Sequence, residues 1–204
     1  MFLSVFDMFK VGIGPSSSHT MGPMVAAARF LDLLRKAPFS VAGVKASLHG
    51  SLAFTGVGHA TDRATILGLA GFLPESYDRD KADAALAQIK ATKTVTPDGL
   101  PALRFDPEAD LRFDFGPNLP GHANGMILSA TDPQGDVILQ ETYYSIGGGF
   151  VMTQAELDTG KDTDDGAPVP YPFRPNCASM ANSMTVRCDR CPTKFSKRLK
   201  FCLR

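Results

Sequence analysis

Three segments of the chain repeat apolar residues at helical spacing. Over residues 21–37, apolar side chains follow the i, i+3, i+4, i+7 pattern of an amphipathic helix. The ranges 62–73 and 80–92 show similar spacing, although Gly68 and Gly71 weaken the pattern in the first of them. The pattern therefore predicts three helices in the first half of the chain.

Period-two alternation of apolar and polar residues marks the predicted strands. It covers residues 41–48 and 111–115, and two β-rich runs at 126–131 and 137–144. The sequence Asp-Pro-Gln-Gly at 132–135 joins the last two runs, and its proline and glycine fit a type I turn. We therefore predict an antiparallel hairpin at this point.

The order of these elements predicts the fold class. One helix, a strand, two helices and then antiparallel strands make an α+β fold with a mixed sheet. The acidic, glycine-containing stretch 155–167 is predicted to be a surface loop.

Composition places the chain among globular proteins. It is 44% hydrophobic and 21% charged, and no run approaches the 18 uninterrupted apolar residues of a membrane span. Asp7 and Lys10 interrupt the apolar N-terminus before it reaches the length of a signal sequence. We expect a cytoplasmic protein without membrane attachment.

Charge and cysteine are concentrated at the C-terminus. Residues 174–204 hold eight of the 21 basic and one of the 21 acidic side chains, together with all four cysteines. The body therefore has no disulfide framework. The basic segment lacks interleaved aromatic residues and any known motif, so we expect no nucleic-acid partner.

The first candidate site is the run Gly-Ile-Gly-Pro-Ser-Ser-Ser-His-Thr at 12–20, directly before the first predicted helix. A helix N-terminus attracts carboxylate or phosphate through its free N–H groups and partial positive charge. His19 lies among hydroxyls and can bind the same anion or exchange a proton with it. The alternative is a serine-rich helix cap beside a solvated histidine.

Three more glycine-rich turns are candidates. His59 lies in a glycine loop at 56–62, His122 and Asn124 lie in the turn 120–126, and a triple-glycine segment spans 145–150. Each has a structural alternative: an N-cap by Asp62 or by Thr61 for the first, a simple turn for the second, and close packing for the third. His49, on the polar side of the first predicted strand, ranks second to these.

These segments, in this order, resemble the β domain of the bacterial iron–sulfur-dependent L-serine dehydratases, also called L-serine ammonia-lyases. The resemblance spans roughly residues 2–173, and it rests on the segments 4–10, 12–24, 50–64, 122–126 and 143–150. It implies a β-domain fold related to the allosteric serine-binding domain of some phosphoglycerate dehydrogenases. It also implies that water is eliminated from L-serine, giving pyruvate and ammonia.

The resemblance assigns roles to the candidate residues. It implies that His59 is the base for the α-proton and that His19 also faces the substrate. Substrate-binding roles follow for Ser16, Ser17, Ser18, Thr20, His122 and Asn124. A [4Fe-4S] cluster is implied as the Lewis acid, with its cysteine ligands on a large α domain, so we expect no metal ligand in this chain alone.

The family pattern stops near residue 173, which divides the chain into a β domain at 1–173 and a tail at 174–204. In the tail, Cys188 and Cys191 form a Cys-x-x-Cys pair, whereas Cys177 and Cys202 lie at irregular distances from it. We favour translation in a shifted reading frame over a small zinc site as the explanation.

Two functions from different classes follow. The first is the β portion of an L-serine dehydratase that is incompetent without its α domain or a separate α chain. The second is a non-catalytic module that binds L-serine or another small carboxylate. Both take L-serine as the ligand, and both leave open whether the chain forms a homodimer.

Overall fold

The computed structural model of the chain describes residues 12–162. Its elements in chain order are η1 (Ser17–Met21), α2 (Gly22–Arg35), β1 (Gly43–Gly50), α3 (Ser51–Phe54), η2 (Val57–His59), α4 (Thr61–Leu69), η3 (Pro74–Ser76), α5 (Arg79–Thr92), β2 (Thr94–Val95), β3 (Leu103–Arg104), β4 (Leu111–Asp114), β5 (Asn124–Thr131), β6 (Val137–Gly147), β7 (Phe150–Thr153) and α6 (Gln154–Asp162). The predicted boundary at residue 173 and the cysteine-containing tail lie outside the described residues.

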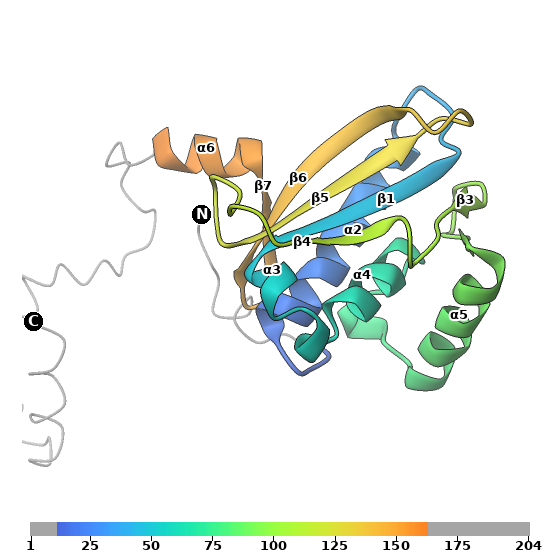
Figure 1. Cartoon of the computed structure of the whole chain (residues 1–204), viewed down its shortest axis with the longest axis horizontal. Coiled ribbons are helices and arrows are strands. Elements are labelled where there is room, and N and C mark those ends of the chain that lie inside the picture. The colour runs from blue at the N-terminus through green and yellow to red at the C-terminus, as the bar shows by residue number, and fades with distance from the viewer. Residues whose placement is uncertain (1–11, 163–204) are drawn as a thin grey trace, which may run out of the picture. The chain divides into compact units, whose positions relative to one another are not determined.

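One mixed sheet organises the described part of the chain. Its strand order is β2-β3-β1-β5-β6-β7, and β4 also pairs with β1. The central strand β1 runs parallel to β3 and β4 and antiparallel to β5. Helices α2, α4 and α5 lie on one side of this sheet (Figure 1). The predicted α+β class with a mixed sheet is confirmed.

Helix α2 forms the centre of the core. Phe30 and Leu31 are fully buried, and they belong to the same apolar cluster as Leu48 of β1 and Leu128 of β5. Burying a side chain of this size stabilises the fold by roughly 1.5–3 kcal/mol. The apolar stripe predicted for this helix is therefore the face that packs on the sheet.

The helix at 21–37 was predicted at the right place, but its start differs. A π-helical turn, η1, leads into α2, because the backbone N–H groups of Thr20 and Met21 both donate to the carbonyl of Ser16, at 3.0 and 3.2 Å. The helical path therefore begins at the serine run itself. As a result, the backbone of the run is fixed by the helix that follows it.

The predicted hairpin is confirmed. Strands β5 and β6 pair antiparallel over their length. The Gly135 N–H donates to the Asp132 carbonyl at 3.1 Å, and Gly135 has a φ of +93°, which glycine adopts without strain. The turn chemistry read from residues 132–135 therefore determines this connection.

The helix predicted at 62–73 begins at Thr61 and ends at Leu69. The predicted N-cap is wrong, because no side chain caps this helix and Asp62 lies within its first turn. There its carboxylate faces the positive end of the helix dipole. The helix ends early because Gly71 adopts a φ of +93°.

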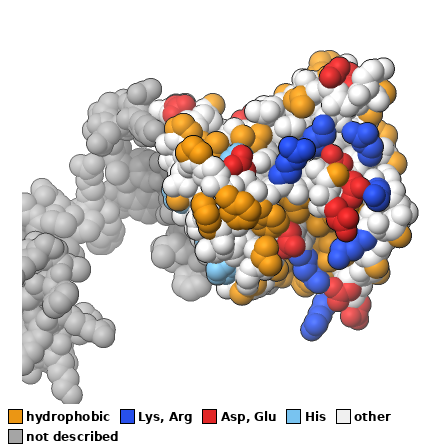
Figure 2. All heavy atoms as spheres, viewed as in Figure 1, with side chains coloured by type: hydrophobic (Ala, Val, Ile, Leu, Met, Phe, Trp, Pro, Cys, Tyr) orange, Lys and Arg blue, Asp and Glu red, His pale blue; other side chains and the backbone are white. Residues whose placement is uncertain are grey.

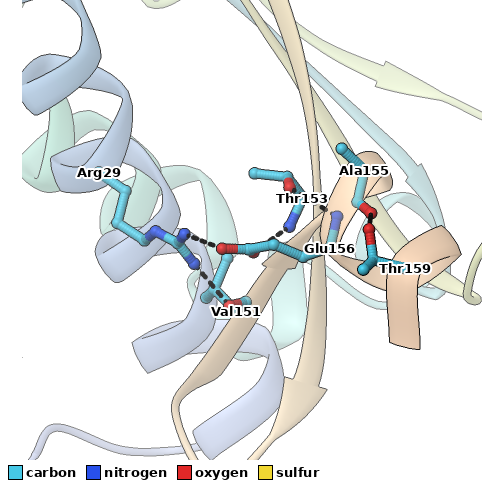
Figure 3. A network of polar contacts seen from close by, with 6 residues as sticks. All are labelled: Arg29, Val151, Thr153, Ala155, Glu156 and Thr159. Atoms are coloured by element: carbon cyan, nitrogen blue, oxygen red, sulfur yellow. Dashed lines mark hydrogen bonds and ion pairs between the residues drawn. The ribbon is translucent and has the colours of Figure 1, made fainter. Parts of the chain in front are cut away.

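The surface loop predicted at 155–167 is wrong over its described part, which is helix α6. A capping box explains the helix: the Glu156 N–H donates to Thr153 Oγ1 at 3.2 Å, and the Thr153 N–H donates to Glu156 Oε2 at 2.8 Å. Arg29 of α2 donates to Glu156 Oε1 and to the Val151 carbonyl, both at 2.7 Å (Figure 3). These bonds tie the start of α6 to α2.

Candidate functional site

Four loop segments meet at one end of the sheet and are joined in a ring by hydrogen bonds. The serine run at 16–20 contacts the segment 50–59, where His19 Nε2 lies 2.9 Å from Ser51 Oγ. That segment contacts residues 121–125 through the Ser51 N–H and the Ala123 carbonyl, at 2.8 Å. Local sequence features had marked each segment separately, and the fold brings them together.

The last segment, 145–149, closes the ring. Asn124 Nδ2 donates to the Ser145 carbonyl at 3.1 Å, and the Gly148 N–H donates to Ser17 Oγ at 3.2 Å. All four predicted glycine-rich turns therefore border one site.

His19 and His59 form the centre of this site. Their ring centroids lie 4.8 Å apart, with the planes tilted by 38°. His19 comes from η1 and His59 ends η2, and both rings are half-buried. Two imidazoles this close can act on the same small ligand.

The hydrogen bond of His59 fixes its tautomer. His59 Nδ1 lies 2.9 Å from the carbonyl oxygen of Thr55, an atom that only accepts. The ring must therefore carry its proton on Nδ1, and in the neutral imidazole Nε2 keeps a lone pair. This is the arrangement that a general base requires.

Thr20 holds the loop that carries His59. Its hydroxyl donates to the His59 carbonyl at 2.8 Å and accepts from the Ser16 N–H at 3.2 Å. Thr20 is only 2% exposed. Its hydroxyl proton is thus engaged within the protein, which makes it a positioning residue for His59, and its predicted contact with a substrate carboxylate stays a prediction.

The three serines of the run differ in their surroundings. Ser16 caps η1, where its hydroxyl accepts from the His19 N–H at 3.2 Å. The Ser18 hydroxyl lies 2.9 Å from His19 Nδ1, and Ser17 is exposed beside Gly148. The hydroxyls of Ser16 and Ser18 therefore contact His19, whereas that of Ser17 contacts the triple-glycine segment.

Asn124 begins β5, and His122 lies two residues before it, next to the Ala123 carbonyl that accepts from the Ser51 N–H. The Asn124 N–H donates to His122 Nδ1 at 3.0 Å, so in the neutral ring the proton is on Nε2. The structure thus joins these residues to the site through the Ala123 carbonyl. Their substrate-binding role stays a prediction.

Burial lowers the pKa of His19 below the ordinary histidine value, and the neighbouring His59 lowers it further, whereas Ser51 partly opposes the shift. Both causes disfavour the protonated form of His19 relative to the neutral form.

Replacing His59 with asparagine is expected to raise the pKa of His19 while leaving it below 6.5, because the charge repulsion is lost and the burial remains. Titration of the imidazole resonances by NMR measures this shift. The variant His49→Asn is the control. A wild-type His19 pKa at or above 6.5 would contradict the described geometry.

Sequence reasoning missed Ser51 and Thr55, whose contacts orient His19 and His59. The available signal was local: Gly50 ends the first strand and Ser51 directly follows it, as expected for a residue placed at a sheet end. Neither contact is visible without the fold.

His49 belongs to a different surface. It is 8% exposed, and its Nδ1 lies 3.7 Å from an Asp114 carboxylate oxygen. With Lys45 and Arg112 it lines an open hollow of about 680 Å³ on the outer face of the sheet. The structure therefore places His49 apart from the His19–His59 pair, and its rank among the candidates stays a prediction.

Within residues 12–162, no group of three or more histidine, cysteine, aspartate or glutamate side chains gathers in a way that could hold a metal ion. The four cysteines fall outside this range. Across the same residues, no helix is both long and apolar enough to cross a bilayer.

Comparison with known proteins gives consistent matches. The family described as "Serine dehydratase beta chain" matches residues 4–156. The L-serine dehydratase of Streptomyces coelicolor is 43% identical over 176 residues, which are 85% of this chain and 39% of that protein. The L-serine dehydratase of Haemophilus influenzae is 43% identical over 175 residues, or 84% of this chain and 38% of that protein.

A third relative extends the match. The L-serine dehydratase of Mycobacterium tuberculosis is 38% identical over 200 residues, which are 97% of this chain and 41% of that protein. That match therefore continues past residue 173. The chain spans about two fifths of the length of the curated relatives it matches.

Proposed function

Because this chain belongs to the serine dehydratase beta-chain family, we propose that it is the β portion of an L-serine ammonia-lyase. The reaction removes the α-proton and the hydroxyl of L-serine as water, and the resulting aminoacrylate hydrolyses to pyruvate and ammonia. The observation that carries the proposal is the His19–His59 pair, 4.8 Å apart at the meeting point of four loops.

In this proposal His59 is the general base. Its Nδ1–H donates to the Thr55 carbonyl, which leaves the Nε2 lone pair for the α-proton. Thr20 fixes the backbone of His59, and Ser51 orients His19. His19 lies beside the base, and a substrate hydrogen bond to its ring would replace the Ser18 contact at Nδ1.

The serine run binds the substrate carboxylate. The Ser18 hydroxyl lies beside His19 and the exposed Ser17 hydroxyl beside Gly148, both at the start of the helical path that continues into α2. Hydroxyl donors and the partial positive charge of that helix end stabilise an anion. His122 and Asn124 complete the far side of the site.

The family resemblance implies a [4Fe-4S] cluster as the Lewis acid that assists departure of the hydroxyl. Residues 12–162 contain no cysteine and no metal-binding group, so they do not fit the cluster as its ligands. In the proposed assembly, its ligands belong to the part of the enzyme that this chain does not match. The chemistry that we assign to residues 12–162 is substrate binding and proton transfer.

The test is pyruvate formation from L-serine, measured anaerobically after iron and sulfide reconstitution. We expect no pyruvate from the full chain alone. We expect turnover when the chain is co-expressed with the part of the Haemophilus influenzae L-serine dehydratase that it does not match. The intact Haemophilus enzyme is the positive control, and turnover by the chain alone would overturn the requirement for a partner.

A second candidate function rests on the partial solvent exposure of the site. The exposed Ser17 and half-buried Ser18 and His19 can hold a small carboxylate without any reaction. A regulatory module of this kind would bind L-serine yet form no pyruvate, even in a complex shown to be intact by co-elution. That outcome would favour the binding module over the lyase.

A further inference from the structure

The four segments that form the site share one property, which is the absence of charge. No aspartate, glutamate, lysine or arginine occurs in residues 12–28, 46–61, 115–131 or 142–155. All four histidines of the chain lie in these four uncharged runs. Over the whole chain, 21% of residues are charged, so the runs mark one end of the molecule as distinct.

Buried strands and helices explain only part of this depletion. The runs include exposed loops, and loops at the surface normally carry charged side chains. The connection 96–110, for comparison, carries one basic and four acidic residues. The uncharged loops therefore call for an explanation other than core packing.

Large apolar side chains are exposed on these loops. Phe54 is 63% exposed, Val57 is 74% exposed and Phe115 is 62% exposed. The rings of Phe54 and Phe115 pack edge to face, with centroids 5.4 Å apart. In Figure 2, hydrophobic side chains gather over α3 and the adjoining end of β4, whereas basic and acidic side chains are interspersed over the half that carries α5.

This apolar patch, defined as Phe54, Val57 and Phe115, borders the pair formed by His19 and His59. Phe54 ends α3, which begins at Ser51, and Val57 begins η2, which ends at His59. Protein interfaces are depleted of charge at their centre and enriched in aromatic residues. Exposed apolar clusters in an otherwise charged surface mark such interfaces.

We propose that the uncharged end of the molecule, centred on Phe54 and Phe115, is the surface onto which the rest of the L-serine dehydratase docks. The occupant is the part of the relatives that this chain does not match, about three fifths of their length. The inference rests on the proposed function, because that function supplies the partner. Docking here would also cover His19 and His59 and exclude water from the reaction.

A second copy of this chain fits the surface less well. Two copies joined through this end would bury both histidine pairs against each other and leave no path for L-serine. A longer partner that brings its own residues to the site does not have this conflict.

The test measures association and not activity, so that its failure is distinct from a failure of the lyase assignment. The full chain is titrated with the unmatched part of the Haemophilus influenzae enzyme and followed by sedimentation velocity. We expect the double variant Phe54→Ser/Phe115→Ser to weaken association by at least about 30-fold, as for aromatic residues at the centre of an interface.

The matched control is Phe39→Ser/Leu73→Ser, which removes two exposed apolar side chains outside the four uncharged runs. We expect the affinity of this control for the partner to stay within about twofold of wild type. The conservative variant Phe54→Leu should retain most of the wild-type affinity. Thermal unfolding verifies that each variant folds. Unchanged association in the Phe54/Phe115 variant, or a dimer of the chain alone that this variant abolishes, would overturn the proposal.

Discussion

Replacement of His59 by glutamine is expected to lower pyruvate formation by roughly 10²- to 10⁴-fold in the complex of this chain with the unmatched part of its relatives. Glutamine preserves much of the size of the side chain but cannot accept the α-proton. The Nε2 lone pair that the Thr55 contact fixes on His59 is then lost. Initial-rate kinetics should show the loss in kcat, with KM changed little.

Leu73→Ala is the matched control, because Leu73 is 43% exposed and lies outside the four uncharged runs and the proposed docking patch. Its rate should stay close to wild type once association is saturated. A His59→Gln variant that keeps more than a tenth of the wild-type rate would remove His59 from the role of base and leave His19 as the alternative.

Replacement of Gly50 by alanine is expected to lower the free energy of unfolding by about 3 kcal/mol, the sum of backbone strain and overpacking. Gly50 has a φ of +57° and a ψ of −129°, a backbone conformation that residues with a side chain rarely adopt. An added Cβ would lie 2.3 Å from the Ala123 carbonyl oxygen and 2.6 Å from Asn118 Oδ1. Urea denaturation followed by circular dichroism measures the change.

Gly58→Ala is the control for this substitution. A Cβ at Gly58 meets nothing within 4 Å, and its φ is not in the left-handed region, so we expect a change within about 0.5 kcal/mol. Equal stability of the Gly50 and Gly58 variants would contradict the close approach of residues 50 and 123. Because the same approach places the Ser51 N–H on the Ala123 carbonyl, the Gly50 variant should also weaken L-serine binding.

Long periodic segments were predictable from the sequence. Helix α2, helix α5 and the β5–β6 hairpin each bury one face. Their apolar residues therefore recur with a period of about 3.6 residues in the helices and 2 in the strands, which the sequence shows directly. Strands β2 and β3 were not predicted, because each is two residues long and too short to show any period. Their pairing depends on the neighbouring strands.

The start of α6 shows a signal that was present but weak. The capping box of Thr153 and Glu156 lies in the sequence, yet the residues after it include glycine and many acidic side chains, which resemble a loop. The docking of Arg29, which lies more than a hundred residues earlier, adds stabilisation that no local pattern contains.

The site was predictable in its parts but not in its assembly. Glycine-rich turns and the serine run marked His19, His59, His122 and Asn124 because unusual backbone and hydroxyls are local features. The 4.8 Å approach of His19 to His59 joins positions 40 residues apart, and it depends on the bond from Thr20 to the His59 carbonyl. The packing of α4 against α2, the helices that follow the two histidines, also brings them together.

The central claim is that the serine run and His19 form an L-serine carboxylate site. Calorimetric titration of the full chain with L-serine tests it most directly. We predict saturable binding that weakens at least about tenfold in Ser17→Ala and in His19→Ala, with Ser76→Ala, an exposed serine in η3, as the control. Wild-type affinity in both site variants, or no binding of L-serine by the folded chain, would contradict the account.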